Sequence, residues 1–444
     1  MAALIASAAE QAIENQRIGG LQLRVAALCM LVQTCDGYDV GSIGWAVPSL
    51  THEWHVAPPA FALAFLFSNL GIMAGALIAG PIGDRLGRKP LLIGSVALFG
   101  LASLLSAYAP SLEVLTGLRF FTGLGIAGGF AGSTALTADY APERLRQTMI
   151  LITFTGAPLG TFIGGQIVAL LLHLGFGWQS IFYVGGAFPL ALVLVMALWL
   201  PESPRMLAAK ARLAPRDRAV LERFNIAPGS SQALDVARSN TVKMLFGEGY
   251  ARQTLLLWVI FFCSLINLFL FLFWLPEVLH LSGMTPSQSV FASSLYGLGG
   301  IAPVFYLGLA MDRFRADRAL ALHYALGIVF FALIALVTLP YAALLVVAFM
   351  CGATVIGSQD AANAACGALY PARMRTSAIG WALGIGRLGG IAAAPLGAYL
   401  LAMGLPPKHI FLVACGFAFV AAVATACLAY CGKRQVVAAS AAAS

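Results

Sequence analysis

The chain has 444 residues, of which 60% are hydrophobic and only 10% carry a charge. Soluble domains carry about 25% charged residues, so the composition excludes a soluble protein and indicates an all-α membrane protein with many spans. The formal net charge of +8 could suggest a nucleic-acid partner. We expect none, because the basic residues gather in short segments at alternate span boundaries, as the positive-inside rule describes.

The first segment, 1–23, carries Glu10 and Glu14 and has no basic start ahead of an apolar core. It does not fit a cleaved signal peptide, and we expect a short cytoplasmic tail. Twelve apolar spans are predicted after it, near residues 24–47, 60–82, 91–109, 113–138, 147–172, 180–200, 254–279, 288–311, 319–339, 341–366, 377–402 and 408–431.

The one long interruption, 201–253, is rich in Arg, Pro, Ala and Ser. It predicts a cytoplasmic linker between an N-terminal six-helix bundle at 24–200 and a C-terminal six-helix bundle at 254–431, with a cytoplasmic tail at 432–444. Basic clusters precede span 1, follow spans 2, 4, 8 and 10, and occupy the linker and the end of the chain. Both termini are therefore expected in the cytoplasm, which requires an even number of spans.

Two aspartates, Asp36 and Asp39, lie inside the first span. A carboxylate there costs roughly 2.5–3.5 kcal/mol on insertion scales, and residues at i and i+3 share one helix face. The pair is therefore expected to point into a single polar cavity. Desolvation and like-charge repulsion both disfavour ionisation, so the pair is predicted to take up and release protons near neutral pH. The alternative is a satisfied polar pair that bonds neighbouring helices.

Two short sequences recur in the second half of the chain. GPIGDRLGRK at 80–89 returns as GLAMDRFRAD at 308–317, and YAPERLR at 140–146 returns as YPARMR at 370–375, at nearly one offset. Two independent matches at one spacing indicate a duplicated six-span unit. Many secondary transporters are built in this way, with the substrate site at the midplane between the halves.

Several motifs together resemble one family. The segment GPIGDRLGRK at 80–89 resembles the loop 2–3 signature of the major facilitator superfamily. The segment RFFTGLG at 119–125 resembles the RxxxGxG motif of its proton-coupled members. The segment PESPR at 201–205 resembles the sequence that closes its sixth span. More narrowly, DGYD at 36–39 and GWALGIGR at 380–387 are similar to the aromatic acid:proton symporters. The resemblance covers essentially the whole chain and implies the two-fold pseudo-symmetric fold of this superfamily.

A polar latch is expected at the loop after span 2. Gly80 and its neighbour Gly83 would let the span approach another helix closely, and Asp84 lies where it could meet a positive helix N-terminus. The resemblance implies that Arg88 pairs with Asp139 at the end of span 4. The latch that would stabilise the outward-open state comprises Gly80, Asp84, Arg85, Arg88 and Asp139. The alternative is a set of charges that only determines topology.

Two arginines lie inside spans, Arg119 in span 4 and Arg387 in span 11. A buried guanidinium stays protonated and forms bidentate bonds with carboxylates. Arg387 is predicted to hold the substrate carboxylate. For Arg119, substrate binding and control of the protonation of Asp36 and Asp39 stay equally open, and the alternative for both arginines is a fixed structural ion pair.

Aromatic and polar residues near these charges complete the predicted site. Tyr38 and Trp381 flank charged positions and could stack on a planar substrate ring, although most aromatic residues of such proteins face lipid or lie at interfaces. Asp360 and Asn363 in span 10 are further polar candidates. Three interpretations of Asp360 stay open: a gate residue, a partner for Arg387, or a nearly solvated group at the helix end. The aromatic acid:proton symporters usually have a small or apolar residue at this position, so Asp360 is a departure from their pattern.

The sequence contains no Ser-His-Asp arrangement, phosphate-cradling loop or metal-ligand cluster, so we expect neither an enzyme nor a cofactor. The function predicted is proton symport, the import of a small aromatic carboxylate such as a hydroxybenzoate-type acid by alternating access. The protein is expected to act as a monomer in a bacterial-type inner membrane. Alternatives are an aliphatic carboxylate, a sugar or another small metabolite as cargo, or a non-transporting membrane sensor.

Overall fold

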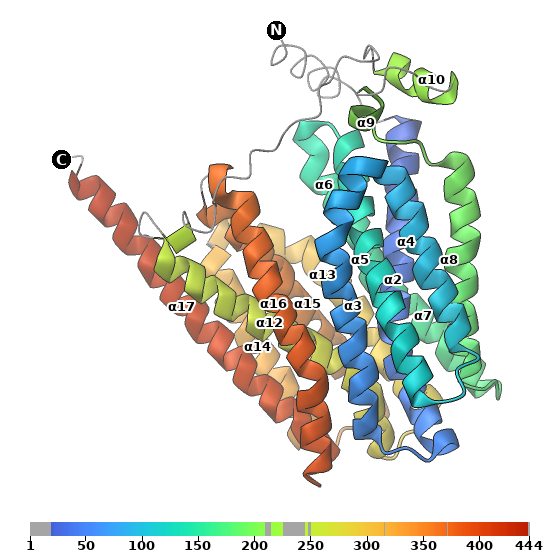
Figure 1. Cartoon of the computed structure of the whole chain (residues 1–444). Helices are drawn as coiled ribbons and strands as arrows, with labels where there is room; N and C mark the ends of the chain where they lie inside the picture. Colours follow the sequence, from blue (N-terminus) through green and yellow to red (C-terminus); the bar gives the residue numbers. More distant parts are fainter. Residues whose placement is uncertain are drawn as a thin grey trace. The chain divides into compact units, whose positions relative to one another are not determined.

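The computed structural model describes residues 19–208, 215–224, 245–246, 250–314, 316–370 and 372–442, and within them all regular structure is helical (Figure 1). The first part of the chain forms α2 (Gly20–Trp54), η1 (Pro58–Phe61), α3 (Ala62–Leu86), α4 (Arg88–Ser106), α5 (Leu112–Tyr140), α6 (Glu143–Phe154), α7 (Gly156–His173), α8 (Gln179–Trp199), α9 (Pro204–Ala208) and α10 (Pro215–Arg223). The second part forms α12 (Ala251–Leu281), α13 (Pro286–Phe314), α14 (Ala316–Leu336), α15 (Tyr341–Leu369), α16 (Ala372–Ala402), η2 (Pro407–His409) and α17 (Ile410–Ala442).

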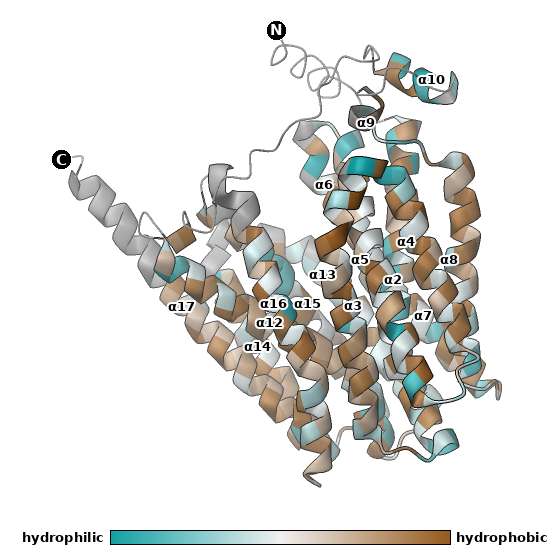
Figure 2. Ribbon diagram, viewed as in Figure 1, coloured by the Kyte–Doolittle hydropathy of each residue, from teal (hydrophilic) through white to brown (hydrophobic). Residues whose placement is uncertain are grey.

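The long helices carry apolar residues on most of their surface, as Figure 2 shows by colour. Large side chains such as Leu77, Leu194 and Leu198 are exposed, which suits contact with lipid tails. Ten helical segments among the described residues are long and apolar enough to cross a membrane. Neither α2 nor α13 is among the ten, so the count of twelve spans and the cytoplasmic position of both termini stay predictions.

The chain divides into two compact units. The first unit comprises Met1–Ser42, Phe67–Thr161 and Trp178–Ala237, and the second unit comprises Ile43–Leu66, Phe162–Gly177 and Arg238–Ser444. Helices α2, α3 and α7 therefore contribute residues to both units. The borders expected from the sequence at 200 and 254 stay predictions.

In the first unit, glycines bring helix backbones close together. A Cβ atom added to Gly37 of α2 would lie 1.9 Å from the carbonyl oxygen of Ala157 in α7, and one added to Gly160 would lie 1.9 Å from the carbonyl oxygen of Thr34. The hydroxyl of Thr161 donates to the carbonyl oxygen of Gly37 at 3.0 Å. Small residues of this kind let membrane helices pack backbone to backbone, which fixes the rotation of α2 about its axis.

The second unit uses the same device. Added Cβ atoms at Gly299 of α13 and Gly352 of α15 would meet carbonyl oxygens of the facing helix at 1.9 and 1.8 Å. Gly386 and Gly389 bring α16 against α12, where an added Cβ at Gly389 would lie 2.3 Å from the carbonyl oxygen of Phe262. This contact decides which face of α16 is turned away from α12.

Candidate functional site

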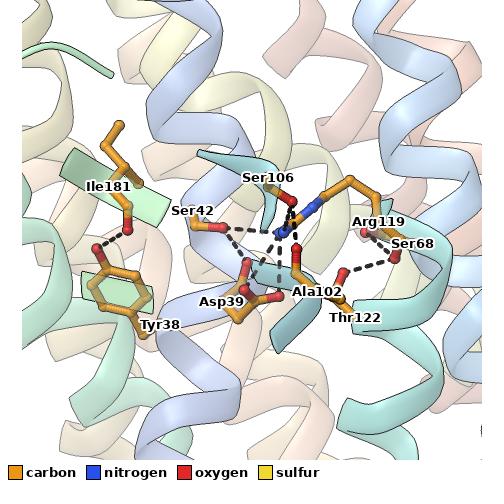
Figure 3. A network of polar contacts seen from close by, with 9 residues as sticks. All are labelled: Tyr38, Asp39, Ser42, Ser68, Ala102, Ser106, Arg119, Thr122 and Ile181. Atoms are coloured by element: carbon orange, nitrogen blue, oxygen red, sulfur yellow. Dashed lines mark hydrogen bonds and ion pairs between the residues drawn. The ribbon is translucent and has the colours of Figure 1, made fainter. Parts of the chain in front are cut away.

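An ion pair lies inside the first unit, away from solvent and lipid (Figure 3). Nη1 of Arg119 in α5 lies 3.3 Å from Oδ2 and 3.4 Å from Oδ1 of Asp39 in α2. Only 2% of Asp39 and none of Arg119 is exposed. Two opposite charges in such a site compensate each other, because either one alone would be a buried, uncompensated charge.

Hydroxyl groups and one ring complete the surroundings of Arg119. Its Nη2 donates to the hydroxyl of Ser106 at 2.8 Å, and its Nη1 donates to the hydroxyl of Ser42 at 3.3 Å. The guanidinium carbon lies 5.0 Å from the centre of the Phe182 ring, within the range of a cation–π contact. Residues of α2, of the end of α4 and of α8 therefore contact Arg119 together, and these three helices fix the position of its guanidinium.

Asp36 lies in different surroundings from Asp39, although the two residues share one face of α2. It is 4% exposed, and neither of its carboxyl oxygens has a hydrogen-bond partner among the described residues. A Cβ added to Gly129 of α5 would lie 3.4 Å from Oδ1 of Asp36. The sequence predicted one polar cavity for both aspartates. The structure separates them into a paired carboxylate and an unpaired carboxyl group.

Tyr38 points from α2 toward α8. Its hydroxyl donates to the carbonyl oxygen of Ile181 at 2.7 Å, and its ring lies beside Gly185, where an added Cβ would be 2.9 Å from Cε1. The ring is buried. Tyr38 thus packs α2 against α8 in this conformation.

A separate polar cluster lies at the turn between α3 and α4. Oε1 of Glu202 accepts hydrogen bonds from the backbone amides of Arg88 at 2.9 Å, Lys89 at 3.1 Å and Ser203 at 2.8 Å. The first amides of a helix have no partner within the helix, so this carboxylate caps α4. Gly87 precedes the helix with φ of +111°, and an added Cβ would lie 2.2 Å from Oε2 of Glu202, so only glycine fits there.

The predicted latch residues lie around this cluster. Asp139 accepts a hydrogen bond from the hydroxyl of Ser203 at 2.6 Å, and the side chain of Arg88 lies over Gly83. Arg85 is exposed, and the side chain of Asp84 is outside the described part. A Cβ added to Gly80 would meet no described atom within 4 Å, so the close helix contact expected at Gly80 is not found there.

Arg387 is half-buried on α16 of the second unit. Its neighbour Gly386 faces α12, where an added Cβ would lie 2.5 Å from Cδ1 of Leu265. Among the residues that the structure describes, no hydrogen bond or ion pair involves Arg387. Its guanidinium thus keeps its donors available for an anion.

The other candidates of the second unit do not form one cluster with Arg387. Trp381 is 43% exposed and stacks on Trp258 of α12 at 6.2 Å between ring centres. It lies six positions before Arg387, which places the two side chains about 120° apart around a helix. Asp360 is exposed on α15, and Oδ1 of Asn363 is buried without a described partner.

Sequence reasoning missed several buried polar residues, and three of them bear on the sites described here. Glu277 in α12 is 0% exposed and neither carboxyl oxygen has a described partner, and Gln359 in α15 is buried with both amide atoms unpaired. The third is the capping residue Glu202. Glu277 carries the same signal as Asp36, an acidic residue inside an apolar segment. Nothing local in the sequence distinguishes Glu202 as a cap of α4, because the two α4 amides that it bonds are more than 100 positions away.

Comparison with known proteins identifies the family. The model of the major facilitator superfamily matches residues 29–394. The chain belongs to the major facilitator superfamily. Its structure is also similar to the crystal structure of a D-xylose–proton symporter, with a TM-score of 0.67 at 16% identity over 91% of this chain and 97% of the symporter. The chain therefore has the fold of this superfamily, and it is a multi-pass protein of the inner membrane.

Two bacterial superfamily relatives match almost end to end. The 4-hydroxybenzoate transporter PcaK of Pseudomonas aeruginosa is 35% identical over 401 residues, which cover 88% of this chain and 89% of the relative. The gallate transporter of Pseudomonas putida is 34% identical over 417 residues, which cover 93% of each chain. Both relatives are named for the transport of an aromatic acid.

Proposed function

We propose that this superfamily member is a proton symporter that imports a small aromatic carboxylate by alternating access. The observation that carries the proposal is the pair of unlike carboxyl groups on α2. Asp39 is compensated by Arg119, whereas Asp36 is buried with no described partner. An uncompensated carboxylate is costly in such a site, so Asp36 is best accommodated as the neutral acid. A group that is neutral in one conformation and ionised in another carries a proton through the cycle.

The ion pair supplies the second element of the mechanism. When Asp36 ionises, its charge adds to that of Asp39, and among the described residues Arg119 is the one guanidinium that pairs with a carboxylate here. Loss of the proton from Asp36 is therefore favoured only in a conformation that admits water to α2. This coupling between hydration and ionisation makes proton release depend on the conformation.

Arg387 is proposed to bind the substrate carboxylate. It is half-buried, its donors are not used by described residues, and a guanidinium binds a carboxylate through two parallel hydrogen bonds. Tyr38 and Trp381 are proposed to contact the substrate ring. Tyr38 is buried against α8 in this conformation, so its contact with cargo requires a change of conformation. Trp381 stacks on Trp258 and remains 43% exposed.

The cluster at the α3–α4 turn is proposed as the cytoplasmic latch. Gly80, Asp84, Arg85, Arg88 and Asp139 form its predicted core, and Glu202 with Ser203 extends it. The bonds tie the start of α4 to the end of α5 and to the segment after α8. Breaking them would free the helix ends on this side of the first unit.

The substrate class is proposed from the relatives named for 4-hydroxybenzoate and gallate. Aliphatic carboxylates remain the second candidate, because Arg387 would bind any carboxylate. A sugar carries no anionic group for Arg387 to bind.

The test uses purified protein in liposomes with an imposed acid-outside gradient and radiolabelled 4-hydroxybenzoate. Wild-type protein should accumulate the label, benzoate should compete, and the uncharged benzamide should not. Asp36→Asn should lose gradient-driven accumulation and retain exchange of labelled for unlabelled substrate, because exchange needs no net proton movement. Accumulation that ignores the gradient, or an Asp36→Asn variant that accumulates like the wild type, would contradict the proposal.

A further inference from the structure

Helix α12 contains Pro276 near its end away from the linker, and the helix continues through it to Leu281. Proline has no backbone N–H, so the carbonyl oxygen of Leu272 loses its donor within the helix. Gly44 of α2 packs at this point, where an added Cβ would lie 2.9 Å from the carbonyl oxygen of Leu272 and 3.2 Å from that of Phe273. Both segments belong to the second unit. The backbone of α2 therefore rests on the weakened turn of α12.

Aromatic rings close the same contact. Phe65 of α3 stacks on Phe273 with ring centres 4.4 Å apart and meets Trp274 edge-on at 5.3 Å. Trp274 also fills the space beside Gly397 of α16. The surroundings of this turn are therefore apolar and closely packed.

Glu277 follows directly after this turn. Its side chain is fully buried, and neither carboxyl oxygen receives a hydrogen bond from a described residue. An ionised carboxylate without donors in such a place would be far costlier than the neutral acid. The described contacts therefore favour the protonated form.

The described charged and titratable groups of the neighbouring elements do not compensate Glu277. Helix α12 packs on α13, α15, α16, α17 and η2 as well as on α2 and α3. Such groups near this end of α12 and its neighbours are His52, Glu53, His55, His280, Tyr296, Tyr341, Tyr399, Lys408 and His409. None of them forms a hydrogen bond or ion pair with Glu277. His280 is bonded to the carbonyl oxygen of Met284, and Tyr296 to that of Leu268.

We propose that Glu277 is a proton-binding site of the second unit, which holds its proton while α12 packs against Gly44 and Phe65 and releases it when this packing opens. The proposal rests on the proton coupling proposed above and adds a carboxyl group that is separate from Asp36. By linkage, acid stabilises the packed arrangement and a rise in pH favours its opening. A proton at Glu277 would thus keep this end of α12 closed.

The first test asks whether Glu277 carries a proton. Protein in lipid nanodiscs is treated with dicyclohexylcarbodiimide at neutral pH and mapped by mass spectrometry. The reagent adds to a protonated carboxyl group and the adduct rearranges to a stable N-acylurea, without a leaving group. The exposed Glu113 is the internal control, because an ordinary glutamic acid is only about 0.2% protonated at pH 7. We expect at least about tenfold more adduct at Glu277. Equal labelling of both residues would overturn the proposal.

The second test measures the opening. Hydrogen exchange of residues 268–281 is followed against pH and corrected for the intrinsic exchange rate. The wild type should lose protection as the pH rises, by up to about tenfold per pH unit if one proton is released on opening. Glu277→Gln should stay protected and independent of pH, and Glu113→Gln should behave like the wild type.

A Glu277→Gln variant with the pH dependence of the wild type would refute the role of Glu277. Neither test uses substrate or a proton gradient. Failure of the proposed symport and failure of this proposal are therefore separate results.

Discussion

The ion pair between Arg119 and Asp39 allows a quantitative prediction. At an N–O distance of 3.3 Å, the Coulomb attraction is about 5 kcal/mol for an effective dielectric constant of about 20. Removal of one member of a buried pair typically costs 3–5 kcal/mol, because the other charge stays buried. The bonds to both carboxylate oxygens come from Nη1 alone and are longer than ideal, so we expect the lower end of this range.

Arg119→Met should therefore lower the free energy of unfolding by about 3 kcal/mol, and Asp39→Asn should lower it by a similar amount. The double variant removes both charges together and should lose only about 3–4 kcal/mol, less than the sum of about 6 kcal/mol for the two single variants, which corresponds to a coupling energy of about 2–3 kcal/mol. The measurement is equilibrium unfolding in mixed micelles, followed by tryptophan fluorescence. Arg24→Met is the control, because Arg24 is exposed and should change stability by no more than about 0.5 kcal/mol.

The reasoning would be refuted by either of two results. One is a loss below about 1 kcal/mol for Arg119→Met, which would mean that water or lipid headgroups already compensate Asp39. The other is a double variant whose loss equals the sum of the two single losses, which would mean that the two charges do not interact.

Two further predictions concern the first unit. Glu202→Ala should lower the free energy of unfolding by about 1–2 kcal/mol, because it removes the cap from the first amides of α4. The control is Glu53→Ala, which changes an exposed residue and should leave the free energy of unfolding unchanged. Equal effects of the two substitutions in thermal or denaturant unfolding would exclude the capping role. Gly160→Ala should destabilise the protein by about 1–3 kcal/mol, since its methyl group would lie 1.9 Å from a backbone oxygen of α2. The methyl group of Gly94→Ala would meet no described atom within 4 Å, so this control should leave the melting temperature unchanged or raise it. If Gly160→Ala were as stable as Gly94→Ala, the close packing of α2 on α7 would be wrong.

Much of the architecture could be predicted from composition and local pattern. The membrane class follows from hydropathy, and the motifs at 80–89, 119–125 and 201–205 resemble the superfamily to which the chain belongs. The candidate residues inside apolar spans were found in the same way, because an ionisable side chain in the bilayer is costly enough to stand out in sequence. The same rule applied to α12 would have found Glu277.

Sequence alone determined which ionisable groups lie within helices, and only the tertiary structure decided which of them are compensated. Asp36 and Asp39 are three positions apart and look alike in sequence. Asp39 meets Arg119, 80 positions away, and Asp36 meets no described donor. The reason is geometric, because hydropathy is a property of each segment, whereas a side-chain pair depends on the rotation and tilt of two helices. Close backbone contacts such as those of Gly37 and Gly160 set this rotation and tilt.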